Sequence, residues 1–441
     1  MNDDLPDDLD FTGRELRILS AVGYYGPSET FHASVIYEAS GDILDDAIFE
    51  RNSSIMDRFG ITITENALPY PEALSQIRAS ISAGDDAYDI VSLVDRDALS
   101  LANEGMIYYM DEVPYIDFDK PYWNQSLNES MSIKGRKILA YSDMVLTAYD
   151  FTHILTFNKQ LVADLSLESP YDLVESGQWT LDKFNEYIML GSADLNGDTI
   201  YDQNDRYGFA SLSKHLAPCF WIAAECSSIV KNSDGIPEYT IGSERMIDVL
   251  DRVYEMTWGN NYWCNQVTEA NANVGYQMFS TDQILFCNSN FGQLLGATFR
   301  EMKTDYGIIP YPKYDETQES YYSRVEGGNP YFVPITAGDP DFSGAMLEAL
   351  ACESHNRVIP TYYETALKSK FTRDEQSAQI LDLIMNTRVY DFGDTFFCSY
   401  LRDGFVGQAF SAGNQLTMSM IESNRGTIEA EIQKVLDVLE E

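Results

Sequence analysis

The chain has few basic residues, few cysteines and histidines, and no long apolar run. Its 441 residues include 29 Lys and Arg against 70 Asp and Glu, which gives a formal net charge of −41. Proteins bind nucleic acid and anionic lipid largely through Lys and Arg, so this balance argues against both kinds of partner. No run of about 18 apolar residues occurs, and a membrane-spanning helix is therefore not predicted.

The cysteines and histidines form no motif for metal or nucleophilic chemistry. The six cysteines include no CxxC pair, so buried free thiols are expected, and a disulfide between Cys219 and Cys226 remains open. The four histidines lie far apart, and no HExxH, GxSxG or GxxxxGK[ST] sequence is present. We therefore expect a protein that is not an enzyme. A carboxylate pair of the glycoside hydrolase type is the alternative, because the 70 acidic residues do not exclude it.

The composition is nevertheless that of a folded protein. Apolar residues make up 44% of the chain and aromatic residues 13%, which is enough for well-packed cores. A chain of 441 residues exceeds one ordinary core, so two or more lobes are expected. The first ten residues, MNDDLPDDLD, are acidic and have neither the basic nor the apolar region of a signal peptide, and residues 1–13 are predicted to form a disordered leader.

The order of apolar patterns predicts an α/β fold. A strand over 14–21 is followed by a helical pattern from Ile43 to Phe59, which Gly60 ends, and the apolar run 88–94 reads as a strand buried on both faces. The alternation restarts with a strand at 153–158 and a helix after its predicted N-cap Thr180. Strands that alternate with helices in this way form parallel sheets, so each lobe is expected to contain one.

An acidic stretch of twelve residues, DLNGDTIYDQND, has the spacing of a calcium loop. Its ligand positions are occupied by Asp194, Asn196, Asp198, the carbonyl of Ile200, Asp202 and Asp205. Thr199 stands where the EF-hand has its turn glycine, and Asp205 replaces the final Glu, so the loop is closer to the dockerin type. We predict a structural Ca²⁺ here, and the alternative is a solvated acidic turn.

Aromatic and polar residues follow several predicted strands, where ligands of α/β proteins bind. Aromatic rings cover the apolar faces of sugars, and Asp, Asn and Arg bind their hydroxyl groups. The candidate ligand-binding residues are Tyr24, Tyr25, Asp95, Arg96, Trp221, Trp263, Asn288, Asn290 and Phe291. The low content of basic residues is compatible with such a neutral ligand.

Several segments together resemble a known family. They are YDIVSLV, KPYWNQSL, the stretch ILTFNKQLVADLSLESPYDLVESGQWTLDKFNE, the acidic loop with its continuation RYGF, and MLEALACESHNRVIPTYYETALKSKFTRDEQSAQILDLI. From about residue 14 to its end, the chain is similar to family-1 extracellular solute-binding proteins of ABC importers, in particular to the lipoproteins of the Firmicutes type.

The resemblance implies a type II periplasmic-binding-protein-like fold, with two α/β lobes joined by a hinge and a ligand cleft between them. Lobe 1 is then expected to comprise residues 14–152 and 319–356, and lobe 2 residues 153–318 and 357–441. The implied function is capture of a sugar or oligosaccharide and its delivery to an ABC permease, by a monomeric, extracellular protein that is lipid-anchored in its native form. The signal peptide and anchor cysteine of such proteins are absent from this sequence. A polysaccharide-binding surface adhesin and a calcium-stabilised glycoside hydrolase are the alternatives.

Overall fold

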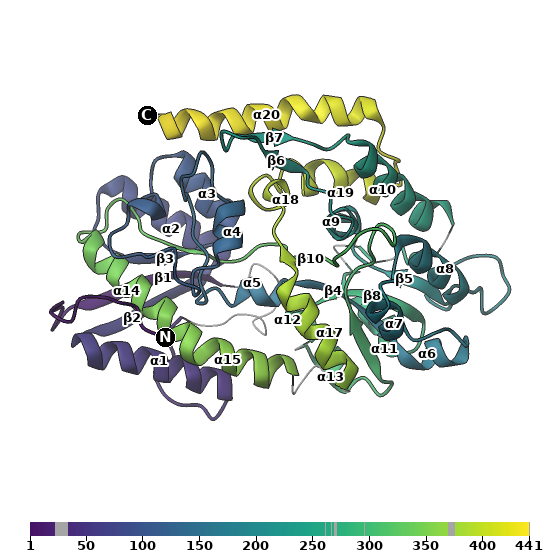
Figure 1. Ribbon diagram of the computed structural model, residues 1–441, viewed down its shortest axis with the longest axis horizontal. Coiled ribbons are helices and arrows are strands. Elements are labelled where there is room, and N and C mark those ends of the chain that lie inside the picture. Colours follow the sequence, from purple (N-terminus) through teal and green to yellow (C-terminus); the bar gives the residue numbers. More distant parts are fainter. Residues whose placement is uncertain are drawn as a thin grey trace.

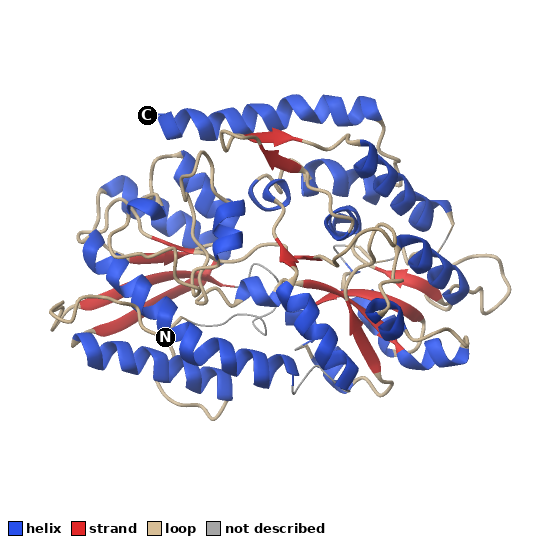
Figure 2. Cartoon of the chain, in the orientation of Figure 1, coloured by secondary structure: helices blue, strands red, loops and turns tan. Residues whose placement is uncertain are grey.

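The computed structural model describes residues 1–22, 34–260, 262–265, 267–268, 271–294, 296–368 and 375–440. Most of the strands belong to two four-stranded sheets, and helices pack around both sheets (Figure 1). Figure 2 shows these sheets as two separate groups of strands on the two sides of the molecule. The expected two-lobed α/β architecture is therefore confirmed.

The sheet of lobe 1 is parallel except for one edge strand. It contains β1 (Glu15–Val22), β2 (Thr62–Pro69), β3 (Ile90–Ser92) and β11 (Tyr331–Phe332), in the order β11-β3-β1-β2. Strand β1 pairs in parallel with β2 and β3, whereas β11 is antiparallel to β3. The run 90–94 is buried throughout, as expected for a strand that helices cover on both faces.

Helix α1 (Ile43–Phe59) of lobe 1 ends at the predicted Gly60, and further helices pack around the sheet. They are α2 (Tyr70–Ala83), α3 (Asp95–Asn103), α4 (Gln125–Ser130), α5 (Thr147–Asp150), α14 (Pro340–Glu353) and α15 (Ile359–Thr361). The side chain of Asp42 caps α1 by accepting hydrogen bonds from the N–H groups of Leu44 and Asp45. Gly60 ends α1 with φ +66°, a left-handed conformation that favours glycine.

The sheet of lobe 2 is mixed. It contains β4 (His153–Asn158), β5 (Tyr207–Ala210), β8 (Ile284–Asn290) and β9 (Tyr306–Ile309), in the order β5-β8-β4-β9. Strand β5 runs parallel to β8, and β4 is antiparallel to both β8 and β9. The antiparallel pairs of β4 with β8 and β9 correct the expectation of a parallel sheet in this lobe.

Helices cover this second sheet as well, and a separate short hairpin packs against α18 (Phe392–Phe396) and α20 (Met418–Glu440). The helices are α6 (Lys159–Asp164), α7 (Pro170–Glu175), α8 (Leu181–Gly191), α9 (Ser213–Ala223), α10 (Glu244–Tyr254), α11 (Asn273–Ser280), α12 (Phe291–Leu294), α13 (Ala297–Glu301) and α17 (Glu375–Asn386); β6 (Ile229–Lys231) and β7 (Pro237–Tyr239) form the hairpin. The predicted cap of α8 is confirmed, since the Thr180 side chain accepts a hydrogen bond from the N–H of Lys183.

Three chain segments run side by side between the lobes. Strands β10 (Ser323–Arg324) and β12 (Arg388–Val389) pair in parallel. The N–H of Glu326 donates to the carbonyl of Phe151 (3.0 Å). The first crossing of the chain between the lobes, at Phe151, therefore lies beside the second crossing, at Glu326. Few hydrogen bonds hold such short strands together, so this region has the character of a hinge.

The lobe boundaries differ from the predicted ones near the C-terminus. The helical residues 354–368 pack against α1 of lobe 1, so the last crossing lies after Lys368 and not at 356–357. The chain then forms α17 on lobe 2, followed by α18 (Phe392–Phe396), α19 (Gly407–Ser411) and α20 (Met418–Glu440). Figure 1 shows α20 lying across the top of both lobes, and its ends bind one lobe each: Arg425 donates to the carbonyl of Tyr239, and Glu440 pairs with Lys134.

The N-terminal residues are ordered, contrary to the prediction of a disordered leader over 1–13. Leu5 and Phe11 are buried, and the ring of Phe11 lies edge-on to that of Phe342, with 5.0 Å between centroids. Asp3 forms an ion pair with Arg58 of α1. The leader thus has enough apolar and charged contacts to pack against lobe 1 despite its acidic composition.

All six cysteines are free thiols, and five of them are buried. The Cys219–Cys226 disulfide that the sequence left open is not formed. Among the described residues, no helix combines the length and the apolar character that crossing a membrane requires.

Candidate ligand-binding site between the two lobes

The carboxyl ends of strands from both sheets lie at the junction between the lobes. In lobe 1 the parallel strands β1 and β3 end at Val22 and Ser92, and in lobe 2 β5 and β8 end at Ala210 and Asn290. Helix α5 of lobe 1 contacts α12, which directly follows β8 (Figure 1). Ligands of α/β sheets bind outside the carboxyl ends of strands, and this junction is therefore the candidate ligand-binding site.

Hydroxyl and amide groups line a hollow on the lobe 1 side of the junction. Its lining includes Ser20, Ser34, Ser92, Thr147, Asn329 and Tyr331. The hydroxyls of Ser34 and Tyr331 are 2.6 Å apart, and Ser92 donates to the carbonyl of Asn329 (3.0 Å). The hollow measures about 20 Å³, which is room for about one water molecule.

A second small hollow lies on the lobe 2 side. It is lined by residues that follow β5 and β8, among them Ser211, Asn288 and Tyr276, and it measures about 10 Å³. Neither hollow can hold a sugar ring. The part of the junction that the described residues form thus has two small hollows, one on each lobe.

Two predicted residues, Asp95 and Arg96, begin α3 at the carboxyl end of β3. The Asp95 carboxylate is buried and accepts hydrogen bonds from the N–H of Gly328 (2.9 Å) and the hydroxyl of Tyr141 (3.3 Å). Its burial raises its pKa to about 7. Asp95 thus fastens lobe 1 to the second crossing, whereas the half-buried Arg96 donates to the hydroxyl of Tyr70 (2.7 Å).

Three further predicted residues, Asn288, Asn290 and Phe291, lie together at the end of β8 and are all buried. The amide oxygen of Asn288 accepts from the Tyr311 hydroxyl (2.7 Å) and lies 3.1 Å from Nδ1 of His153. The side chain of Asn290 accepts from the N–H of Gln293 and so holds the turn into α12. The structure therefore brings these residues to the junction, where their polar groups are bound to neighbours.

The two predicted tryptophans are parts of the core of lobe 2. Trp221 lies in the middle of α9 with an exposed fraction of 0%. Trp263 donates its indole N–H to the carbonyl of Ser211 (2.9 Å) and packs edge-on against Trp258. Both rings are buried, so neither offers an open face to a ligand in this structure. Tyr24 and Tyr25 lie outside the described residues.

A buried ionic cluster that no sequence motif indicates lies at the lobe 2 side of the junction. It consists of His153, His215, Arg324, Glu326, Asp394 and Arg402. Arg324 and Asp394 form an ion pair of 2.6 Å in which both side chains are 0% exposed. Glu326 lies 3.1 Å from Nε2 of His153 and 3.3 Å from the guanidinium of Arg402. The chain distance between these residues hides the cluster from the sequence.

The charges of the ionic cluster compensate one another. Burial alone would disfavour the charged form of Glu326, yet His215 and Arg402 hold its pKa well below its usual range. Burial lowers the pKa of His215 well below its ordinary value. His153, His215 and Glu326 are close enough to share a metal ion, but Arg324 contacts both imidazoles at 2.9 and 3.1 Å. A guanidinium in this position opposes a cation, so the cluster is better explained as an ionic link from the hinge to lobe 2.

The acidic loop 194–205 lies at the surface of lobe 2, between α8 and β5. An antiparallel bridge between Ala193 and Arg206 closes it. The Asp194 carboxylate accepts from the N–H groups of Gly197 (2.7 Å) and Thr199 (2.8 Å), and Asp205, which is 0% exposed, accepts from those of Leu195 and Asp202.

The backbone of the same loop fits a calcium site, but its carboxylates do not yet converge on one point. The side chain of Ile200 is 65% exposed, as expected if only its carbonyl serves as a ligand. Among the described residues, however, three acidic or histidine side chains converge within 4.8 Å only at His153, His215 and Glu326, and not in this loop. An ion would therefore have to draw the loop carboxylates inward.

The comparisons with known proteins concern the fold. No family model matches the chain, and a search of curated proteins gives no match. Among solved structures, it is similar to the ABC substrate-binding protein Lmo0181 from Listeria monocytogenes in complex with cycloalternan (12% identity, TM-score 0.60, 95% of this chain and 99% of the other covered).

Two further structures match over similar lengths. The maltose/maltodextrin-binding domain MalE from Bdellovibrio bacteriovorus, bound to maltotriose, has 15% identity and a TM-score of 0.56, with 95% and 100% of the two chains covered. UgpB from M. tuberculosis in complex with glycerophosphocholine has 16% identity and a TM-score of 0.57, with 89% and 95% covered. At these identities the likeness shows the fold: the chain has the two-lobed, periplasmic-binding-protein-like fold of ABC solute-binding proteins.

Proposed function

We propose that this protein captures a sugar or oligosaccharide at the junction between its lobes and delivers it, chemically unchanged, to the permease of an ABC importer. The observation that carries the proposal is the meeting of strand carboxyl ends from both sheets at a junction lined by hydroxyl, amide and carboxylate groups. Hydroxyl and amide side chains can both donate and accept hydrogen bonds, as sugar hydroxyls require. The cycloalternan and maltotriose complexes of proteins with this fold support the same ligand class.

Movement of the lobes about the hinge would complete the capture. The two hollows that the described residues line have room for about one water each, so separation of the lobes about the hinge strands would open these hollows to a ligand. Ser34, Ser92 and Tyr331 bind mainly to one another and to backbone in this structure. A sugar would replace these bonds with its own hydroxyls and stabilise a closed state around itself.

A thermal-shift screen tests the ligand class. Linear and cyclic gluco-oligosaccharides should raise the melting temperature with increasing concentration, because a ligand that binds only the folded protein stabilises it. Tyr331→Phe should weaken the response, whereas Tyr321→Phe, which removes a buried hydroxyl that does not line the hollow, should not. If sugars leave the melting temperature unchanged and glycerophosphocholine raises it, the proposed ligand class is wrong. The protein would then still be a solute-binding protein, for a different ligand.

The resemblance also implies a cellular location, an oligomeric state and a membrane partner, which we include in the same proposal. We propose an extracellular, monomeric protein of the Firmicutes lipoprotein type, held at the cell surface by a lipid anchor and partnered by two permease subunits. The net charge of −41 supports the monomeric state, since repulsion keeps copies of the protein apart. Recovery of the native protein in the membrane fraction, and its release by a lipase that removes the anchor, would test the location.

We also propose that the loop 194–205 binds a structural Ca²⁺. Four aspartates and Asn196 offer oxygen ligands within twelve residues, and such a density of carboxylates is compensated by a cation. The buried Asp205 already anchors the end of the loop to the body of lobe 2. Calcium would therefore stabilise lobe 2, which is measured as a calcium-dependent rise in melting temperature.

A further inference from the structure

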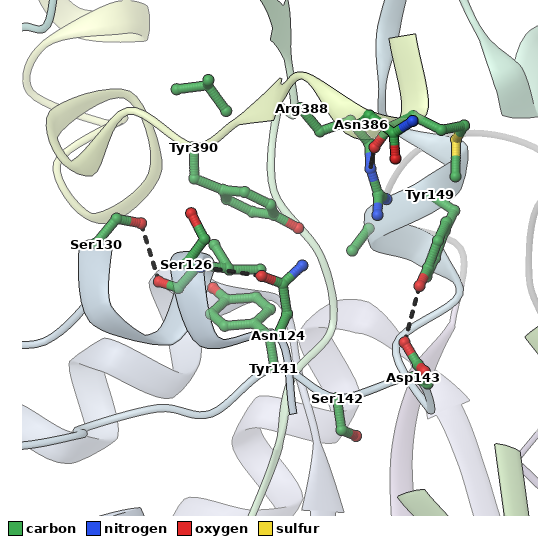
Figure 3. A pocket seen from close by; sticks show the side chains of 14 residues that line it. Asn124, Ser126, Ser130, Tyr141, Ser142, Asp143, Tyr149, Asn386, Arg388 and Tyr390 are labelled. Atoms are coloured by element: carbon green, nitrogen blue, oxygen red, sulfur yellow. Dashed lines mark hydrogen bonds between the residues drawn. The ribbon is translucent and has the colours of Figure 1, made fainter. Parts of the chain in front are cut away.

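A larger cavity lies beside the hinge and contains none of the predicted site residues. It measures about 210 Å³. One wall comes from lobe 1, from α4 and the segment 141–149, and the other from residues 385–390, which include β12 of the hinge (Figure 3). The six residues that define its chemistry are Asn124, Tyr141, Asp143, Tyr149, Arg388 and Tyr390.

Arg388 brings a positive charge to this cavity. Its guanidinium lies 4.1 Å from the ring centroid of Tyr149, and its Nε donates to the carbonyl of Met385 (3.2 Å). Among the described residues no carboxylate lies within ion-pair distance of Arg388, although acidic residues outnumber basic ones by 41 in the whole chain. Its two terminal nitrogens are suited to a planar anion such as a carboxylate.

Two more hydrogen-bond donors face the same space. The hydroxyl of Tyr390 is buried and has no hydrogen-bond partner among the described residues. Burial and the nearby Asp95 raise the pKa of Tyr390 well above its usual value, so this hydroxyl stays protonated and can donate. Buried polar groups without a partner are rare in folded proteins, and such a group points to a missing acceptor.

The orientation of Asn124 is fixed by the helix that it caps. Its amide oxygen accepts the N–H of Leu127 (3.0 Å), and therefore its NH₂ group is turned away from α4. Figure 3 shows this NH₂ group, the Tyr390 hydroxyl and the Arg388 guanidinium all facing the space between the rings of Tyr141 and Tyr149. Three donors without a shared acceptor thus converge on one cavity.

The one acidic residue of the wall does not oppose an anion. One oxygen of Asp143 accepts from the hydroxyl of Tyr149 (2.8 Å), and the other is 2.6 Å from Nδ1 of His355. The hydrogen bond to Asp143 also raises the pKa of His355, which favours the imidazolium form. Asp143 is therefore compensated, and Arg388 dominates the charge inside the cavity.

The size of the cavity limits its occupant to one ring. At the usual interior packing density of about 0.75, a cavity of about 210 Å³ holds about 155 Å³ of molecular volume, of the order of one pyranose with its substituents. Tyr141 and Tyr390, with ring centroids 5.4 Å apart, and Tyr149 provide apolar faces for such a ring.

We propose that this cavity is a second binding site, specific for a single sugar acid of the uronate class, with the carboxylate on Arg388 and the ring hydroxyls on Tyr390 and Asn124. The inference does not rest on the proposed function, because the cavity lies outside the junction where capture of the transported sugar is proposed.

Calorimetric titration of the whole protein with D-galacturonate tests the proposal. Binding is expected with a dissociation constant below about 1 mM, whereas D-galactose, which has no carboxylate, should bind this site at least about tenfold more weakly. Digalacturonate should not bind at this cavity, because a second ring exceeds it, and any binding of digalacturonate at the junction should therefore be unchanged by Arg388→Gln. A crystal structure with galacturonate should show it between Tyr141 and Tyr149.

Two variants locate the binding. Arg388→Gln should weaken galacturonate binding at least about tenfold, and Arg388→Lys should restore part of it. Tyr390→Phe, which removes only the hydroxyl, should weaken it about three- to tenfold, whereas the control Tyr321→Phe should have no effect. Absence of galacturonate binding, or galacturonate binding that neither Tyr390→Phe nor Arg388→Gln changes, would overturn the proposal. Binding of galactose or digalacturonate that Arg388→Gln weakens as much as that of galacturonate would overturn it as well.

Discussion

The two sides of the interlobe junction are built from different chemical groups. On the lobe 1 side, serine and tyrosine hydroxyls bind one another, and Asp95 is held by a backbone N–H and a hydroxyl. On the lobe 2 side, the ionic cluster compensates buried charges with buried charges, as in the pair of Arg324 and Asp394. Lobe 1 therefore offers neutral groups, and lobe 2 a fixed charged network.

This difference implies a division of tasks. A neutral hydroxyl can exchange one hydrogen bond for another at little cost, because the net contribution of such a bond is about 1 kcal/mol. A buried ion pair cannot be opened so easily, since an unpaired buried charge costs several kcal/mol. We infer that a ligand finds its adaptable partners on lobe 1, while the ionic cluster keeps the hinge strands fixed to lobe 2.

The largest expected effect comes from breaking the ionic cluster. Asp394→Asn removes one charge of a fully buried pair and leaves Arg324 without its closest carboxylate. We expect the free energy of unfolding to fall by about 3–5 kcal/mol in urea denaturation. The control Asp86→Asn, at a half-exposed ion pair with Arg17 in lobe 1, should cost less than about 1 kcal/mol. Equal losses in the two variants would contradict the contrast between the lobes.

The pH dependence of stability should reveal the lone carboxylate of lobe 1. The pKa of Asp95 is about 7 in the folded protein against an ordinary value of 3.8, so the folded form binds the proton more tightly. This contribution to stability is fully present below about pH 4 and is lost as the pH rises through 7. Relative to Asp95→Asn, the wild type should therefore gain about 2–4 kcal/mol of unfolding free energy between pH 8 and pH 4.

Unfolding measured by urea at each pH supplies these values. The difference between wild type and Asp95→Asn is the relevant quantity, because the many other acidic groups titrate in both proteins. A difference that does not change with pH would show that Asp95 keeps an ordinary pKa, and that the lobe 1 side of the junction is more hydrated than its burial indicates.

Removal of calcium should affect lobe 2 and leave lobe 1 unchanged. With free Ca²⁺ at about one hundred times the dissociation constant, the ion stabilises the folded state by about 2.7 kcal/mol, which a chelator would remove. The melting temperature should fall in chelator and recover with Ca²⁺, and the double variant Asp194→Ala, Asp198→Ala should not respond. Hydrogen exchange should place the loss of protection in α8 and β5, which flank the loop. A melting temperature that does not change in chelator would show that the loop is a solvated acidic turn without a bound ion.

The smallest effect is expected from a single hydroxyl of lobe 1. Tyr331→Phe removes the 2.6 Å hydrogen bond to Ser34, whose hydroxyl retains a contact of 3.4 Å with that of Ser20. The unfolding free energy should therefore fall by only about 0.5–1.5 kcal/mol. A loss as large as that of Asp394→Asn would mean that the lobe 1 side is no more adaptable than the ionic cluster.

Local signals in the sequence predicted much of the fold. The left-handed Gly60 that ends α1 and the Thr180 cap of α8 are confirmed, since both depend on a few neighbouring residues. The boundary after 356 was wrong, because the helical pattern continues to Lys368 and only its packing on α1 assigns it to lobe 1. The parallel expectation for lobe 2 was likewise wrong, since strand direction depends on how distant segments pair.

The candidate site was predicted in part. Asp95, Asn288 and Asn290 lie at the junction, because the carboxyl ends of neighbouring parallel strands lie at one edge of a sheet, and their contact with a ligand stays a prediction. Aromatic character alone did not distinguish a ligand platform from a core residue, and Trp221 is completely buried. The ionic cluster joins residues from His153 to Arg402, a separation that has no counterpart in any local motif.

The sequence by itself determined the elements, the two lobes and the surplus of negative charge, because hydrophobic periodicity, caps and composition act over a few neighbouring residues. Only the tertiary structure decided which polar groups meet: Arg324 with Asp394, Asp95 with Gly328, and Arg388 with Tyr149. The physical reason is that hydrogen bonds and ion pairs act over a few ångströms, and folding alone brings residues that are distant in the chain to that separation.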